Sequence, residues 1–433
     1  MNFSEEQILQ LAPDEASRKA GIGLAGAAKW VSKGAHERAL WGECQGSGSK
    51  PYQTQIDLSD TAFKCSCPSR KFPCKHGLGL LLLNARQPAL FKDAVMPAWV
   101  EEWILKRTGK EEKKTVAAEK VVDEAAQAKR GESREKKVSA GIEELLRWIK
   151  DIIRGGLMQL PDKQPSFWEQ MAKRLIDAQA GGLAVLVKDL GKLNFFLEGW
   201  QTVCMDKLLN IYLIAQGYKN KTLLSVALQQ DIRGWIGFTQ NQEELKDGPG
   251  VPDTWLVLGK QVSQEDQLAV ERYWLYGCST GRTALVLQFL VRAQEAVLSL
   301  TPGMFIEAEL AYYPSVMPLR ALIKKQLSVP PVSLQGVSSG WMEVRKQEVD
   351  TLSLLPITYL RPHVVEQLTP VWHKEQWWLQ DAAGDLMQIL PQFSAIWKLV
   401  AISGGKPLNT AIVGKDFLYE PLGVWENGRY KSL

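Results

Sequence analysis

Four potential metal ligands lie close together near the N-terminus. The segment reads Cys65-Ser66-Cys67-Pro68-Ser69-Arg70-Lys71-Phe72-Pro73-Cys74-Lys75-His76, so its outline is C-x-C-x6-C-x-H. Three thiolates and one imidazole form a complete tetrahedral donor set for zinc. Thiolates this close repel one another unless a cation lies between them, and borderline-soft zinc suits such ligands. The motif therefore predicts one structural zinc ion bound by Cys65, Cys67, Cys74 and His76.

Other interpretations of these cysteines fit less well. A catalytic zinc normally leaves one coordination position open, and four protein ligands close it. A redox pair is disfavoured because C-x-C is not C-x-x-C and no βαβ unit surrounds it. The remaining cysteines, Cys44, Cys204 and Cys278, are isolated, which does not resemble a disulfide framework in a chain of 433 residues. A chance cluster of reduced thiols remains the alternative to the metal site.

The residues around the motif predict a small ββα module. Two strand-like runs, 38–44 and 51–58, flank a Gly/Ser-rich segment, which is typical of a β-hairpin. Residues two apart on a strand point the same way, so Cys65 and Cys67 should face the metal together. An apolar helix starts near Cys74, where backbone N–H groups and the helix dipole favour thiolates.

The hairpin, the C-x-C and C-x-H pairs and the apolar helix together resemble the SWIM zinc finger, over roughly residues 38 to 85. The wider stretch from Leu40 to His76 is similar to bacterial SWIM zinc finger proteins of about this length. The resemblance implies zinc binding, with DNA or protein binding as the activity. Bacterial proteins of this family resemble gene products encoded beside MoxR-type AAA+ ATPases and von Willebrand factor A domain proteins. The resemblance therefore also implies an adaptor role.

The whole chain is expected to have an α+β fold in four parts. Residues 1–105 form the SWIM zinc finger domain with N-terminal helices, and 106–138 form a charged linker with few large apolar residues. Residues 139–225 form a helical domain and 226–433 an antiparallel β-rich domain.

Finer signals give element boundaries. Apolar spacing predicts a helix through 142–153, which Gly155-Gly156 ends. Ser166 and Glu169 form a capping box for the next helix, Gly181-Gly182 follow its last turn, and Cys204 to Gln216 form another helix. The expected strands are Thr254–Val257, Tyr273–Tyr276, Ala284–Leu290, Phe305–Tyr312, Gln376–Gln380, Met387–Leu390, Trp397–Ile402 and Asn409–Val413.

The charge is nearly balanced, at +4, which gives no global case for a nucleic-acid binder. A local basic patch remains open, because Lys64, Arg70, Lys71 and Lys75 surround the motif and Phe72 could stack on a base. These four residues are candidate nucleic-acid contacts. The competing interpretation, which we favour, is that they are solvated and balance the thiolate charges.

The chain has 16 tryptophans, which is unusual. Trp372, Trp377, Trp378 and Trp397 could form a peptide-binding platform, but we expect core packing instead. The segment Gly277 to Thr283 is one residue short of a phosphate loop and is better interpreted as a hairpin turn. No catalytic constellation is visible, and an enzyme site hidden in residues 226–433 is the weakest hypothesis.

The N-terminus lacks a basic and then apolar leader, and no stretch reaches the ~18 apolar residues of a membrane span. We therefore expect a cytoplasmic protein. The leading hypothesis is a non-enzymatic, zinc-binding adaptor that acts through its finger and Trp-rich domains. The alternative is a nucleic-acid-binding protein that uses the finger and its basic loop.

Overall fold

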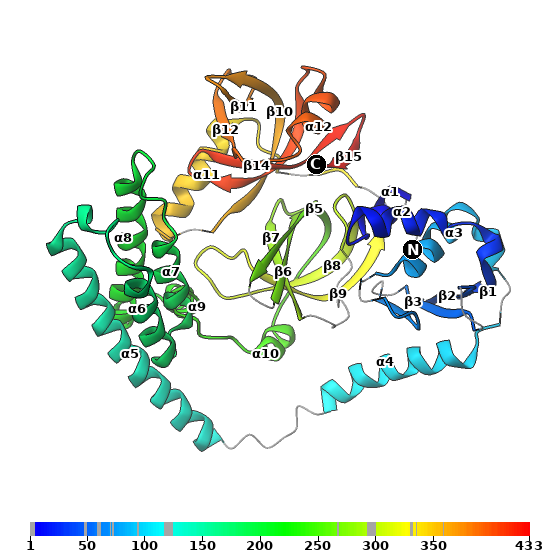
Figure 1. Cartoon of the computed structure of the whole chain (residues 1–433), viewed down its shortest axis with the longest axis horizontal. Helices are drawn as coiled ribbons and strands as arrows, with labels where there is room; N and C mark the ends of the chain where they lie inside the picture. Colours follow the sequence, from blue (N-terminus) through cyan, green and yellow to red (C-terminus); the bar gives the residue numbers. More distant parts are fainter. Residues whose placement is uncertain are drawn as a thin grey trace.

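The computed structural model describes residues 5–46, 50–58, 62–69, 71, 73–92, 95–116, 124–265, 268–291, 300–329, 332–334, 336–357 and 359–433. It confirms an α+β fold, with a helical bundle and three separate, mainly antiparallel sheets (Figure 1). Residues 117–123 of the expected linker lie outside the described residues.

The N-terminal part is a four-stranded antiparallel sheet with helices packed against it. The strands are β1 (Trp30–Ala35), β2 (Ala39–Cys44), β3 (Tyr52–Asp57) and β4 (Ala62–Cys65), which pair in that order. The helices are α1 (Glu5–Gln10), α2 (Glu15–Gly23), η1 (Ala27–Lys29), α3 (Lys75–Arg86), η2 (Pro88–Phe91) and α4 (Ala98–Val116). The predicted hairpin is β2–β3, and the sheet has one further strand on each side of it.

This part has its own apolar core. Leucines on successive positions of α3, from Leu80 to Leu83, are buried against the sheet. They meet Leu40, Ile56 and Phe63 from three different strands. An apolar helix on an apolar sheet face is a stable two-layer arrangement, so the metal motif lies between β4 and α3 with a packed core behind it.

The helices of the second part form a bundle. They are α5 (Glu124–Gly155), η4 (Leu157–Gln159), α6 (Pro165–Asp177), α7 (Gly181–Gly191), α8 (Trp200–Lys219), η5 (Lys221–Leu223), α9 (Val226–Ile236) and α10 (Gln242–Asp247). The periodic apolar face predicted in 142–153 is the buried face of α5. Helices continue past residue 225 to Asp247, and α5 begins well inside the segment interpreted as a linker.

Two terminal signals in this part were wrong. Helix α6 begins at Pro165, its N-cap is Gln164, and no side-chain capping bond forms there, so Ser166 is not a capping residue. A proline is pre-organised for the first helical turn, and the N-cap lies two residues earlier than predicted. Gly181 and Gly182 begin α7 rather than follow the last turn of α6. A Cβ on Gly182 would lie 2.1 Å from the Trp235 carbonyl oxygen, so the glycine is needed for close helix packing.

The third part is a small barrel of five strands. They are β5 (Val251–Glu265), β6 (Leu268–Gly277), β7 (Thr283–Val291), β8 (Phe305–Tyr312) and β9 (Ala321–Val329). The sheet order is β7-β6-β5-β8-β9. A parallel bridge between Leu285 and Arg320 joins its two ends, and Trp255 and Tyr273 are buried inside. The segment that faintly resembled a phosphate loop is the β6–β7 turn, where Asp253 accepts backbone N–H bonds from Ser279 and Thr280.

The last part is a six-stranded sheet with two helices. Its elements are α11 (Trp341–Leu354), β10 (Arg361–His373), β11 (Gln376–Gln380), β12 (Leu386–Ile389), α12 (Ile396–Ser403), β13 (Leu408–Lys415), β14 (Leu418–Glu426) and β15 (Arg429–Ser432). This sheet packs on the outer face of the barrel, above it in Figure 1, with Trp274 and Leu258 against Val364 and Val413.

One predicted strand is a helix. Trp397–Ile402 lies within α12, which ends at Gly404 in the left-handed conformation (φ 54°). A short apolar run has no periodicity that separates a strand from a buried helix, and the glycine after it is the stop signal that decides. The described part of the chain contains no helix that is long and apolar enough to cross a bilayer.

Candidate metal centre

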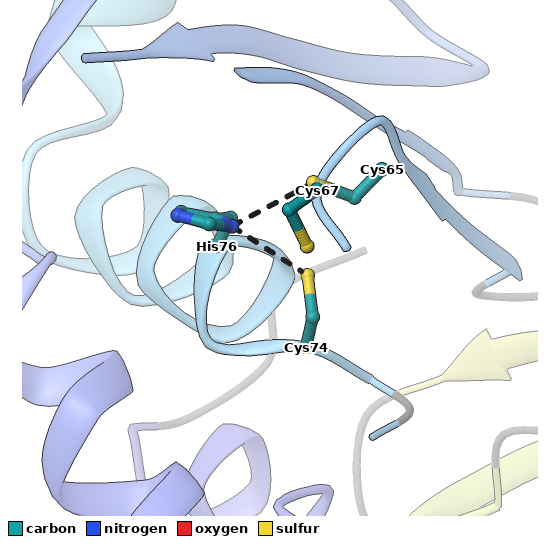
Figure 2. A group of neighbouring side chains, drawn as sticks. All are labelled: Cys65, Cys67, Cys74 and His76. Carbon is teal, nitrogen blue, oxygen red and sulfur yellow. Dashed lines mark hydrogen bonds between the residues drawn. The ribbon is translucent and has the colours of Figure 1, made fainter. Parts of the chain in front are cut away.

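The structure brings all four predicted ligands together. One donor atom from each of Cys65, Cys67, Cys74 and His76 lies within 4.8 Å of the other three donor atoms. Cys65 is the last residue of β4 and Cys67 follows two residues later, whereas Cys74 is the N-cap of α3 and His76 lies in its first turn. Figure 2 shows the three sulfur atoms and one imidazole nitrogen converging on a common point.

The orientation of the His76 ring identifies its ligand atom. Nδ1 lies 3.7 Å from Cys65 Sγ and 4.0 Å from Cys74 Sγ, so this nitrogen faces the sulfurs. The other ring nitrogen points away from them (Figure 2). The Tyr52 ring packs on the imidazole at a centroid distance of 5.0 Å, and His76 is buried. The imidazole is therefore fixed with Nδ1 toward the metal position.

Close packing of α3 on β4 makes this geometry available. A Cβ on Gly77 would lie 2.7 Å from Cδ1 of the buried Phe63 ring, nearer than real Cβ contacts come. Glycine at this position therefore lets the start of α3 approach the end of β4. The two halves of the motif meet as a result of that approach.

The electrostatics of the site favour a thiolate at Cys74 even in the absence of a cation, whereas burial and the neighbouring cysteines raise the pKa values of Cys65 and Cys67. A hydrogen bond from the Cys65 thiol, helped by the backbone N–H groups of His76 and Gly77, lowers the pKa of Cys74 to about 4 against the opposing effect of burial. The pKa of Cys65 is raised, first by that same shared proton and then by burial. Cys74 is therefore the first thiolate of the set, as expected at a helix N-terminus.

This donor set fits one structural zinc ion. Three thiolates and one imidazole are the ligands of a closed tetrahedral site, and the four residues come from a strand end and a helix start. Bound zinc would offset two of the three thiolate charges and cross-link β4 to α3. Thr54 Oγ1 lies 3.2 Å from Cys65 Sγ, and this contact supports the ligand from outside.

The basic residues predicted around the motif do not behave alike. Lys64 and Lys75 are exposed, and they are the sequence neighbours of the ligands Cys65 and Cys74. Lys71 forms an ion pair with Asp14 at 2.6 Å, so this side chain is occupied by the N-cap residue of α2. Arg70 lies outside the described residues, as does Phe72.

Sequence reasoning missed a buried charge cluster beneath the finger. The Asp57 side chain, at the end of β3, has no exposed surface and accepts from both Arg38 and Arg107. Arg107 also lies over the Trp103 ring, and both belong to α4. A strand that ends in aspartate, with an arginine just before the facing strand, was the available signal for the pair of Asp57 and Arg38. The sequence held no signal that Arg107 of α4 would pair with Asp57.

The expectation that the clustered tryptophans pack in a core was wrong for two of them. The Trp372 side chain is 59 % exposed and the Trp397 side chain 71 %. Trp377 lies between them, with ring centroids 5.2 Å and 5.8 Å away. Trp372 and Trp377 are cross-strand partners near the end of the β10–β11 hairpin, where the sheet is not covered.

Comparisons with known families agree with this geometry. Residues 52–84 match the SWIM zinc finger, and residues 133–236 match the SWIM-associated four-helix bundle domain. The first match spans β3, β4 and α3 with all four ligands, and the second spans α5 to the end of α9. No curated protein and no solved structure matches the chain significantly. The chain therefore contains a SWIM zinc finger with one structural zinc site, followed by a SWIM-associated four-helix bundle domain.

Proposed function

We propose that this protein is a non-enzymatic adaptor that binds other proteins in the cytoplasm, and that Cys65, Cys67, Cys74 and His76 are its zinc ligands. The observation on which this rests is the closed Cys3His set. Because all four positions are filled by the protein, the ion has no open site for a substrate or a water nucleophile. Its role is to hold a small module in a binding-competent shape, as in zinc fingers generally.

The exposed aromatic cluster supports protein binding. Tryptophan is enriched at interfaces, because it buries a large area with little loss of side-chain freedom. Trp372 and Trp397 are mostly exposed and so contribute little to the buried core of this chain. We place a protein-contact surface at these residues, on the last sheet and away from the finger.

The partners that we propose are a MoxR-type AAA+ ATPase and a von Willebrand factor A domain protein, as the family resemblance implies. The test uses the purified full-length chain with each purified partner, monitored by calorimetry. We expect binding at micromolar affinity or better and a loss of about 2 kcal/mol in the Trp372→Ala/Trp397→Ala variant. Trp148→Phe, inside the bundle, is the control. Absence of binding to both partners would contradict the proposed partners.

The alternative function is nucleic-acid binding by the finger. The exposed positions of Lys64 and Lys75 favour it, and Arg70 and Lys71 are the further contacts that we propose. Anisotropy of labelled mixed-sequence DNA at low and physiological salt tests it, because each phosphate contact steepens the salt dependence. Binding that is lost in a Lys64→Gln/Lys75→Gln variant would establish the alternative. Binding that survives the double substitution would exclude the finger as the site.

A further inference from the structure

The third part of the chain has the strand connectivity of an OB-fold. Strand β5 pairs with both β6 and β8, β6 pairs with β7, and β8 pairs with β9, all antiparallel. The barrel closes through the parallel bridge between Leu285 of β7 and Arg320 beside β9. OB-folds in general bind their ligands on the face of the second and third strands, next to the loop between the fourth and fifth strands. In this chain that loop is the segment 313–320.

A cavity of about 380 Å³ lies at this position. Its barrel side is formed by Leu285 and Leu287 of β7 and by residues of the 313–320 loop. The opposite side is formed by α9 and the residues that follow it, from Gln230 to Gln242. The helical bundle therefore closes one side of the groove in which an OB barrel binds its ligand, and leaves a pocket of ligand size.

Three aromatic side chains of this pocket are held in place by neighbours. The Tyr359 ring stacks on Trp235 at 4.4 Å with an interplanar angle of 5°. Phe238 contacts the guanidinium groups of Arg134 and Arg233, at 4.2 Å and 4.0 Å from its ring centroid. Rings that are already fixed lose little entropy when a planar ligand stacks on them.

The loop supplies the third ring and the cation. Arg320 lies over the Tyr313 ring at 4.4 Å, and the Tyr313 N–H donates to the Arg320 carbonyl at 2.9 Å. Asp231 of α9 accepts the Val316 N–H at 2.9 Å, which fastens the loop to the bundle. The buried carboxylate is thus occupied by the loop backbone, whereas Arg320 is exposed at the pocket. The charge presented to a ligand is therefore positive.

We propose that this cavity binds a nucleotide, with its base against Tyr313 and Tyr359 and its phosphate at Arg320. Flat rings stack on any base, an arginine pairs with phosphate, and the side-chain amides of Gln230, Gln240 and Gln242 offer donors and acceptors for base edges. A neutral oligosaccharide, the other ligand class of OB barrels, would leave Arg320 without a counter-charge. The nucleotide can belong to a single strand or be free, and the site is separate from the zinc finger.

The test uses the zinc-loaded full-length protein. Anisotropy with a fluorescein-labelled mixed-sequence single strand, as DNA and as RNA, measures strand binding, and calorimetry with AMP and UMP measures free nucleotide. Tight strand binding that millimolar AMP does not displace assigns the site to a strand. Equal affinity for AMP or UMP assigns it to free nucleotide.

Two substitutions locate the site. Gly234 lines the pocket in α9, and a Cβ there meets nothing within 4 Å, so Gly234→Leu fills the pocket and suits the helix. We expect it to weaken binding at least tenfold, in line with the loss of about one stacked base. Arg320→Gln should reduce the slope of log affinity against log salt by about 0.7.

Arg282→Gln is the matched control. Arg282 is an exposed arginine over a tyrosine ring of the same barrel, Tyr312, and it does not line the pocket. It should change affinity less than twofold. The proposal is overturned if neither strand nor mononucleotide binds, or if binding is unchanged by both Gly234→Leu and Arg320→Gln.

Discussion

Arg107 of α4 donates through Nε to Oδ2 of Asp57 at 3.2 Å and so joins this helix to the end of β3, fifty residues earlier in the chain. Arg38 donates to the same carboxylate from the start of the neighbouring strand. Helix α4 is thus part of the finger structure and not a free continuation of it. The carboxylate has no access to water, so the two arginines are what make its charge tolerable there.

Substitution of Asp57 should destabilise the finger. Asp57→Ala leaves two arginines beneath the sheet without their carboxylate, and loss of one partner of a buried pair costs about 3 kcal/mol. Zinc release can be followed with a colorimetric chelator as the urea concentration rises. Asp57→Ala should release its zinc at a lower urea concentration than the wild type. Glu5→Ala, which breaks the exposed pair with Arg86, is the control and should leave the curve in place. An unchanged curve for Asp57→Ala would contradict the structural role of the cluster.

Gly77→Ala should weaken the zinc site without touching a ligand. The added methyl group would meet Phe63, which is buried and has no room to move, so helix and strand must separate. Overpacking of this kind costs about 1 to 3 kcal/mol, and zinc affinity measured by chelator competition should fall. Gly23→Ala is the matched control because its Cβ meets nothing within 4 Å. Equal affinities for the two variants would show that the close approach is unimportant.

The helical bundle should lose stability in acid through Glu135. Burial raises the pKa of this carboxyl, but bonds from Lys221, Tyr218 and Arg233 outweigh it and hold the pKa at about 2. Because the unfolded value is near 4.5, the stabilisation is complete above pH 4.5 and is lost as the pH falls toward 2. The site is partly exposed, so the effect is about 1 kcal/mol after solvent screening.

Thermal unfolding of wild type and Glu135→Gln between pH 7 and 3 measures this contribution. The substitution should lower the melting temperature at pH 7 and flatten the acid dependence. Glu143→Gln, at an exposed position of the same helix, should retain the wild-type profile. A Glu135→Gln profile parallel to that of the wild type would contradict the assignment.

His363 should make the last sheet sensitive to mild acid. Burial, and then the charge of Arg361, lower the pKa of this imidazole to about 4. Between pH 6.5 and 4 the imidazole is therefore protonated in the unfolded state and neutral in the folded state. The free energy of unfolding falls as the pH drops through this window, by up to about 3 kcal/mol. Urea unfolding at pH 7, 5.5 and 4.5 should show this loss in wild type and in the exposed His373→Gln, but not in His363→Gln. A loss of equal size in all three would exclude His363 as its source.

The metal centre could be predicted from the sequence because its determinants are local. The four ligands lie within one short segment, and their residue types and spacing admit few chemistries. The hairpin before them and the helix after them follow from turn residues and an apolar run. Short-range signals of this kind survive without knowledge of the tertiary structure.

Contacts between distant segments could not be predicted in the same way. The pairing of Lys71 with Asp14 depends on where α2 lies relative to the metal loop, and no local pattern encodes it. The same holds for Arg107 and Asp57. Strands β9, β10 and β14 were missed because their apolar residues alternate imperfectly around bulges, as at Val365–Leu368. Strand β15 was missed because it has only four residues. The exposure of Trp397 depends on α12 being a helix, whereas the sequence interpretation had this segment as a strand.

Zinc content per chain tests the central claim most directly. Wild-type protein, Cys74→Ser and Cys204→Ser would be purified without added metal and analysed by mass spectrometry of the element, alongside protein concentration. The account predicts about one zinc in the wild type and in Cys204→Ser, whose cysteine is buried in the helical bundle, and almost none in Cys74→Ser. A wild-type protein without zinc, or a Cys74→Ser variant that retains a full equivalent, would contradict it.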